Sequence, residues 1–273
     1  MKHSRFLPGV LIAAVLGLGL SAVSAVSTAS AAFAQTTATP PADPGAGPGA
    51  GPAAGPAAGP AALRPLRPLT NDIGERIQAC TLCHGAQGRA TAQGYFPRLA
   101  GKPSGYLYNQ LQSFRDGRRH HALMAGLLRH MSDDYLREIA GYFAALDGPY
   151  PAPGPSGLDP AQQARAERLI LQGDPARKVP ACTACHGPSM AGREPAIPGL
   201  LGLPRDYLVG QLGAWRNGLR RAHTPDCMAD VAKALSTDDI AVVASWLAAK
   251  PAGAHPEPPS TTPLPAPCGG LAP

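Results

Sequence analysis

The feature that most constrains this chain is a short motif, Cys-x-x-Cys-His, which occurs twice in matching surroundings and ends at His84 and at His186. Each copy is followed first by a Pro-x-Leu-x-Gly segment and then by a segment that begins with Tyr-Leu and ends with an aromatic residue and Arg. Further along, each copy has a Met, and seven residues after it an apolar residue followed by Ser. Four matching segments in the same order indicate a tandem duplication. We therefore expect two copies of one structural unit.

Apolar spacing and punctuation predict a mostly helical fold. Helices are expected over residues 71–79 and 160–171, and from residue 104 to about 117 with a matching helix in the second copy. Ser132 and Ser236 are typical N-caps, each followed by acidic residues and an apolar helical stripe. No alternating strand pattern is found. The predicted fold class is mostly α, with two small domains over residues 70–147 and 161–250.

The motif spacing favours covalent attachment of haem. Two thiols three positions apart can reach the two vinyl groups of one haem, and the adjacent imidazole can then bind the iron. A covalent haem would also stabilise domains of only about 80 to 100 residues, whose own cores are small. The cofactors predicted are two covalently bound haem c groups. The predicted attachment residues are Cys80, Cys83, Cys182 and Cys185, and the predicted iron ligands from the motifs are His84 and His186.

Three other uses of the cysteine pairs are conceivable: a thioredoxin-like dithiol, a zinc site and structural disulfides. A redox dithiol needs no following His and usually lies in a βαβ pattern, which this sequence lacks. A four-cysteine zinc site usually has its pairs much closer in sequence than the 99 positions between Cys83 and Cys182. Haem attachment is the preferred interpretation.

The second axial ligand has to come from the opposite face of the haem, so the chain must pass around the ring. Met124 lies 40 residues after His84, and Met228 lies 42 residues after His186, at the same distance before the closing helix. These two methionines are the predicted ligands.

Other candidate ligands fit less well. Met131 aligns with Leu235, which favours core packing, and Met190 is only four residues after His186. Hydrophobic packing is the usual role of any Met. Four histidines are alternative ligands, although none has a matching His in the other copy: His120, His121, His130 and His223.

The first residues have the order of a secretory signal. Lys2 and Arg5 precede an apolar run, and small residues lead to an Ala-Phe-Ala cleavage pattern before Gln35. Residues 1–34 are therefore predicted to be removed and the protein to be exported to the periplasm, although an uncleaved membrane anchor is an alternative. Loss of the signal would change the net charge from +6 to +4.

The sequence contains 32 glycines and 32 prolines. Many of them lie in two predicted linkers, residues 35–69 and 148–160, and in a predicted tail, residues 251–273.

Residues 70–250 resemble the tandem di-haem class I cytochromes c of the c4 type. The resemblance implies two class I domains, each around one haem. It also implies that the backbone carbonyls of Pro97 and Pro198 accept a hydrogen bond from the ligating histidines, which would fix the imidazole orientation. His and Met ligation leaves no open position on the iron and raises the reduction potential. The expected activity is outer-sphere transfer of single electrons, without enzymatic catalysis.

Three functions are compatible with these features. The first is a periplasmic carrier between respiratory redox proteins, from a quinol-oxidising complex or a dehydrogenase to a terminal oxidase or reductase. The second is the electron-transfer subunit of a periplasmic dehydrogenase that oxidises an alcohol or a sulfur compound. The third is a di-haem peroxidase, which would need a vacant or displaceable ligand. The mild charge gives no support for nucleic-acid binding, and a membrane is a partner only by association or through an uncleaved signal.

Two further features have more than one interpretation. Six arginines follow the matching helices and either pair with haem carboxylates, attract an acidic partner or are simply solvated: Arg115, Arg118, Arg119, Arg216, Arg220 and Arg221. Cys227 and Cys268 are left over, and in an oxidising compartment they could form a disulfide, remain free thiols or pair between molecules.

Overall fold

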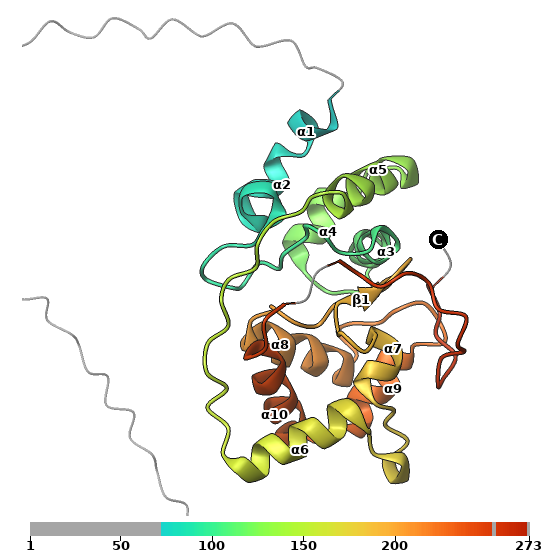
Figure 1. The fold of residues 1–273 in the computed structure, drawn as a ribbon. Coiled ribbons are helices and arrows are strands. Elements are labelled where there is room, and N and C mark those ends of the chain that lie inside the picture. Colours follow the sequence, from blue (N-terminus) through green and yellow to red (C-terminus); the bar gives the residue numbers. More distant parts are fainter. Residues whose placement is uncertain (1–71, 253–254, 272–273) are drawn as a thin grey trace, which may run out of the picture. The chain divides into compact units, whose positions relative to one another are not determined.

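The computed structural model describes residues 72–252 and 255–271 (Figure 1). The predicted signal peptide and the linker over residues 35–69 lie outside the described residues. We call the part of the chain that contains the motif ending at His84 the first unit, and the part that contains the motif ending at His186 the second unit. The described residues of the first unit form five α-helices and one 3-10 turn: α1 (Ile73–Arg76), α2 (Gln78–His84), η1 (Ala86–Gly88), α3 (Ser104–Arg115), α4 (Ala122–Leu128) and α5 (Asp133–Ala144).

The second unit has the same order of α-helices, but its 3-10 turn precedes the motif helix instead of following it, and two short strands follow the motif. Its elements are α6 (Pro160–Leu171), η2 (Pro175–Arg177), α7 (Cys182–His186), β1 (Gly192–Arg193), β2 (Ile197–Pro198), α8 (Arg205–Arg216), α9 (Cys227–Ala234) and α10 (Thr237–Ala248). β1 and β2 are antiparallel, with Gly192 opposite Pro198. The sequence did not predict these strands, because two residues are too short to show an alternating pattern. The predicted mostly helical class is confirmed.

Local capping explains where the main helices begin. The hydroxyl of Ser132 accepts a hydrogen bond from the backbone N–H of Tyr135, and the hydroxyl of Ser236 accepts one from that of Asp239. Asp159 and Gln162 form a capping box at the start of α6. The helix expected over residues 71–79 is instead two helices, because the backbone leaves the helical conformation at Ile77, with ψ of 6°.

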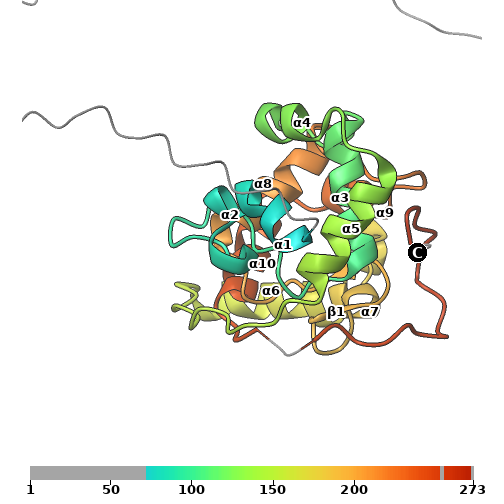
Figure 2. The same ribbon diagram turned by 90° about the horizontal axis from the view of Figure 1, so that it is seen from above.

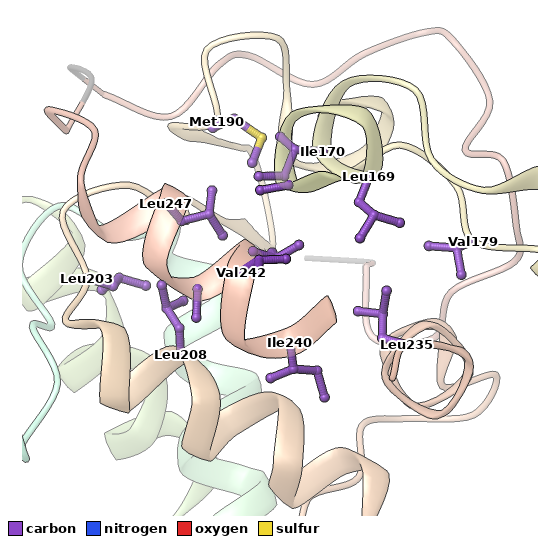
Figure 3. Packing of buried hydrophobic residues seen from close by; sticks show 13 residues of the cluster. Leu169, Ile170, Val179, Met190, Leu203, Leu208, Leu235, Ile240, Val242 and Leu247 are labelled. Carbon is purple, nitrogen blue, oxygen red and sulfur yellow. The ribbon is translucent and has the colours of Figure 1, made fainter. Parts of the chain in front are cut away.

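The core of the second unit lies between α6, α8 and α10. Figure 3 shows Leu169 and Ile170 of α6 on one side of it and Leu247 and Val242 of α10 on the other, all buried. The core of the first unit is formed in the same way, by the apolar faces of α3 and α5 around Phe143. α3 and α5 lie side by side in Figure 2. In each unit the closing helix therefore packs on the helix that follows the motif.

The two units meet through equivalent residues. The backbones of Arg119 and Arg220, which match each other in the repeat, form an isolated antiparallel β-bridge. The backbone N–H of His120 donates to the carbonyl oxygen of Leu219 (2.9 Å), and the N–H of Arg221 donates to that of Arg118 (2.7 Å). An offset of 101 residues converts the first of these bonds into the second. The contact is therefore self-complementary, as in a two-fold symmetric dimer.

Among the described residues, no helix has the length and apolar character that crossing a membrane requires.

Candidate functional site

Each unit contains a cavity that brings its predicted haem residues together. The motif, the following proline and the matched Met line each cavity. In the first cavity these are Cys80, Cys83, His84, Pro97 and Met124, and in the second they are Cys182, Cys185, His186, Pro198 and Met228.

The two motif histidines are held by backbone carbonyls. Nδ1 of His84 lies 2.9 Å from the carbonyl oxygen of Pro97, and Nδ1 of His186 lies 2.7 Å from that of Pro198. A carbonyl oxygen can only accept, so Nδ1 carries the proton and Nε2 keeps its lone pair for a metal. Burial lowers the pKa of both imidazoles, although the carbonyl contacts act in the opposite direction. Both side chains are therefore neutral near pH 7, as iron ligation requires.

None of the four motif cysteines forms a disulfide within the described residues. Burial raises the pKa of Cys80, and it raises that of Cys182 to about 11. A redox-active dithiol instead needs a thiol with a lowered pKa. Within residues 72–252 and 255–271, no three His, Cys, Asp or Glu side chains gather in a way that could hold a metal ion. The raised pKa of these thiols opposes the dithiol interpretation of the pairs.

The matched methionines occupy the first turn of short helices that the sequence did not predict. Met124 lies in α4 and Met228 in α9. Nδ1 of His121 accepts a hydrogen bond from the backbone N–H of Met124 (3.4 Å), so this histidine caps the helix that carries the methionine. His120 and Met131 also line the first cavity, and His223 the second.

The remaining methionine candidates have packing roles. Met131 packs against the first core, and Leu235, its counterpart, is buried in the second. Met190 is buried beside α6 (Figure 3).

Four of the six clustered arginines have two distinct roles. Arg115 donates to the carbonyl oxygen of Met131 (3.0 Å), and Arg216 donates to that of Leu235 (2.6 Å). These bonds join the end of α3 to the start of α5, and the end of α8 to the start of α10. Arg119 and Arg220 are buried between the units; both line the first cavity, and Arg220 also lines the second. The sequence alone could not separate these roles, because in each unit the arginines are close neighbours at the end of the matching helix.

The buried arginines are bound by neutral acceptors from both units. Arg119 donates to Oε1 of Gln211 (2.7 Å) and to the hydroxyl of Tyr207 (3.1 Å). In the equivalent contacts, Arg220 donates to Oε1 of Gln110 (2.8 Å) and to the hydroxyl of Tyr106 (3.3 Å).

This region has a surplus of buried positive charge. Lys102 is also buried and lines both cavities, and none of the ion pairs of the described residues joins Lys102, Arg119 or Arg220 to a carboxylate. Burial alone would raise the pKa of Tyr106, but these three cations outweigh it and lower the pKa to about 8. Buried charges need anionic partners. The two carboxylates of a haem would supply them, so the residues present fit this cofactor.

An unpaired donor in the second cavity supports the same conclusion. Nε1 of Trp215 is buried and has no hydrogen-bond partner, and the indole lines the cavity. Its counterpart in the repeat is Phe114, which has no polar atom to satisfy. A carboxylate acceptor in the second cavity would satisfy this donor.

The C-terminal tail contributes to the second site, although its composition resembles that of the linkers. Cys268 forms a disulfide with Cys227, which decides between the alternatives left open by the sequence. Tail residues also line the second cavity, among them Leu264, Ala266 and Leu271. Sequence reasoning missed this role, and the only signal for it was the pair of leftover cysteines.

No protein-family model matches the chain. It is 38% identical over 174 residues to the thiosulfate dehydrogenase electron acceptor of Thiomonas intermedia, covering 63% of this chain and 79% of the relative. It is 37% identical over 174 residues to cytochrome c4 of Pseudomonas aeruginosa, covering 63% of this chain and 84% of the relative. The crystal structure of reduced cytochrome c4 from Pseudomonas stutzeri matches with a TM-score of 0.56 and 33% identity, covering 64% of this chain and 95% of that one. This chain belongs to the cytochrome c4 family.

Membership of the cytochrome c4 family establishes the cofactor and the kind of activity. The chain carries two covalent haem c groups, in agreement with its two Cys-x-x-Cys-His motifs. It is a di-haem electron-transfer cytochrome with two class I domains, and its relatives are named as electron carriers rather than as catalytic enzymes. Its partners are redox proteins.

Proposed function

We propose a specific ligand set for the two haem groups. Cys80 and Cys83 attach the first haem, Cys182 and Cys185 attach the second, His84 and Met124 bind the first iron, and His186 and Met228 bind the second. The observation that carries this proposal is that each cavity is lined by one complete motif together with one of the two matched methionines.

The chain's own residues favour simple electron transfer. Bound haem supplies a one-electron iron couple. The proline carbonyls hold both imidazoles in one tautomer, and Met124 and Met228 would complete the iron ligation, which would leave no position for a substrate. Apolar side chains exclude water from the cavities, and the buried charges of Arg119 and Arg220 favour the state with one more electron. The proposed mechanism is outer-sphere transfer, with the two sites joined through the interface between the units.

Optical spectroscopy and variants of the methionines test the ligand set. We expect two haems per chain, a ferric sulfur-to-iron charge-transfer band and no reaction of the reduced protein with carbon monoxide. Met124→Ala and Met228→Ala should each remove about half of the band and lower the midpoint potential of one haem. Met131→Leu is the matched control, because its counterpart in the second unit is already Leu, and it should leave the band unchanged.

Three results would contradict this ligand set: a single haem per chain, an unchanged band in either alanine variant, or loss of the band in Met131→Leu. Rapid turnover of hydrogen peroxide by the isolated protein would favour the peroxidase alternative instead.

The proposed location is the periplasm. The predicted signal peptide over residues 1–34 and the disulfide between Cys227 and Cys268 support it, because disulfides persist in oxidising compartments. Cell fractionation and N-terminal sequencing test it. A mature protein that begins at Gln35 is expected, and an intact N-terminus at Met1 would support the alternative of a membrane anchor.

The proposed electron donor is a dehydrogenase that oxidises a sulfur compound. The support is the similarity to a relative named as the electron acceptor of thiosulfate dehydrogenase. Stopped-flow mixing of the oxidised protein with thiosulfate dehydrogenase and thiosulfate should reduce both haems within the turnover time of the enzyme. No reduction there, combined with rapid reduction by a quinol-oxidising complex, would favour the general respiratory carrier instead.

A further inference from the structure

The described C-terminal residues 255–271, which we call the C-terminal strap, run along the second unit. In Figures 1 and 2 the red trace of this segment passes β1 and α7. Two separate anchors hold it, one near each predicted axial ligand of the second haem.

The first anchor joins the strap to the loop that follows the second motif. The backbone N–H of Glu257 donates to the carbonyl oxygen of Gly192, and its carbonyl oxygen accepts from the N–H of Glu194, both at 2.8 Å. The carboxylate of Glu257 accepts from the N–H and the hydroxyl of Ser189. A Cβ atom on Gly187, where φ is +84°, would lie 2.6 Å from this carboxylate. The strap therefore packs directly on the residue that follows the motif histidine.

The second anchor joins the strap to the segment that carries the predicted methionine ligand. Cys268 is bonded to Cys227, the residue immediately before Met228. The N–H of Gly269 donates to the carbonyl oxygen of Pro225 at 2.7 Å, on the other side of the same turn. The covalent link thus fixes the first turn of α9.

The strap also forms part of the cavity wall. Its residues from 264 to 271 contribute to the lining beside Met228 and Trp215. The side-chain amide of Asn109, on α3 of the first unit, donates to the carbonyl oxygen of Gly270, so the end of the strap is held from both units. Any movement of the strap would therefore change the surroundings of the second haem directly.

The first unit provides an internal comparison. The position that matches Cys227 is Leu123, which precedes Met124 and is 53% exposed. Among residues 72–252 and 255–271, no disulfide joins the helix of Met124 to another segment. The two methionine segments are alike in sequence position and helical form but differ in how they are restrained.

We propose that the C-terminal strap positions Met228 through the Cys227–Cys268 disulfide and so maintains iron ligation in the second haem alone. This inference rests on the proposed function, in which Met228 binds the second iron. It goes further in assigning a ligand-holding role to a segment that lies beyond the repeated unit. The strap makes the two haem sites inequivalent despite their common ancestry.

The double variant Cys227→Ser/Cys268→Ser, prepared with both haems attached, tests the proposal. We expect the ferric sulfur-to-iron band to weaken by up to half, the midpoint potential of one haem to fall, and up to one haem per chain to bind carbon monoxide after reduction. The other haem of the same molecule is the internal control and should keep its potential. Thr261→Ala, an exposed change elsewhere in the strap, should alter neither haem.

A second measurement avoids dependence on the folding of the double variant. The disulfide of the folded, wild-type protein is reduced with a phosphine, the thiols are blocked with iodoacetamide, and the haems are reoxidised. The same changes at one haem are expected.

Met228→Ala separates the two possible failures. If this variant loses half of the band while both disulfide-cleaved forms keep the wild-type band, potentials and inertness to carbon monoxide, the strap proposal is overturned and the ligand set stands. If Met228→Ala itself leaves the spectrum unchanged, the ligand set has failed.

Discussion

Replacing Asp239 by Asn should destabilise the second unit in a pH-dependent way. This carboxylate accepts hydrogen bonds from Arg165 of α6 (2.9 Å) and from Arg177 (2.7 Å), and it completes the capping box of Ser236 at the start of α10. Burial by itself would raise the pKa of Asp239, but the bonds from Arg177, Ser236 and Arg165 outweigh burial and lower the pKa from 3.8 to about 2.

The expected magnitude follows from this pKa. At 1.36 kcal/mol per unit of pKa, the difference between 3.8 and about 2 corresponds to about 2 kcal/mol of folding free energy. Because the folded pKa is the lower one, this stabilisation is fully present above about pH 4 and is lost as the pH falls towards 2. At neutral pH, Asp239→Asn should therefore lower the free energy of unfolding by about 2 kcal/mol.

Urea unfolding followed by far-ultraviolet circular dichroism at pH 7 and at pH 2.5 measures both effects. The deficit of Asp239→Asn against wild type should be largest at pH 7 and should shrink at pH 2.5. Asp134→Asn is the control, because its ion pair with Arg137 is exposed and is worth little. An equal deficit at both pH values, or an equal effect in the control, would refute the assignment of this stabilisation to the ionised carboxylate.

Three further predictions follow from the core, the disulfide and the interface between the units. Leu169→Ala should cost about 2 to 5 kcal/mol in unfolding experiments because Leu169 is fully buried, whereas Leu171→Ala, at an exposed position of the same helix, should cost far less. Cys227→Ser/Cys268→Ser should lower the free energy of unfolding by about 4 kcal/mol in the chain-entropy model for a separation of 41 residues, and a loss below about 1 kcal/mol would contradict it. Arg119→Gln should lower the midpoint potential of the first haem, and Arg220→Gln should lower those of both haems, since Arg119 lines the first cavity and Arg220 lines both. An upward shift in voltammetry would contradict this reasoning.

The sequence predicted those parts of the fold that depend on local signals. α6 spans residues 160–171 as expected, because Asp159 and Pro160 are both favourable at a helix start. Ser132 and Ser236 begin the closing helices for the same reason. The motif copies and their spacing also predicted which residues gather in each cavity, since a duplicated unit folds in the same way twice.

The features that the sequence did not predict depend on contacts between distant segments. The C-terminal strap has Pro-rich composition without hydrophobic periodicity, so nothing local distinguishes it from a linker. Its position depends on Glu257 and on one disulfide. The sequence likewise placed Arg119 and Arg220 near the end of a helix, but only the meeting of the two units buries them. The roles of Met124 and Met228 as iron ligands remain predictions.

The self-complementary contact between the units has a consequence for the architecture of the chain. Both units contribute the same Tyr, Gln and Arg positions to it, and each backbone bond is repeated by its equivalent. A surface that pairs with its own copy is what a homodimer uses. One polypeptide therefore contains, between its two halves, the pairing that two separate copies of one unit would make.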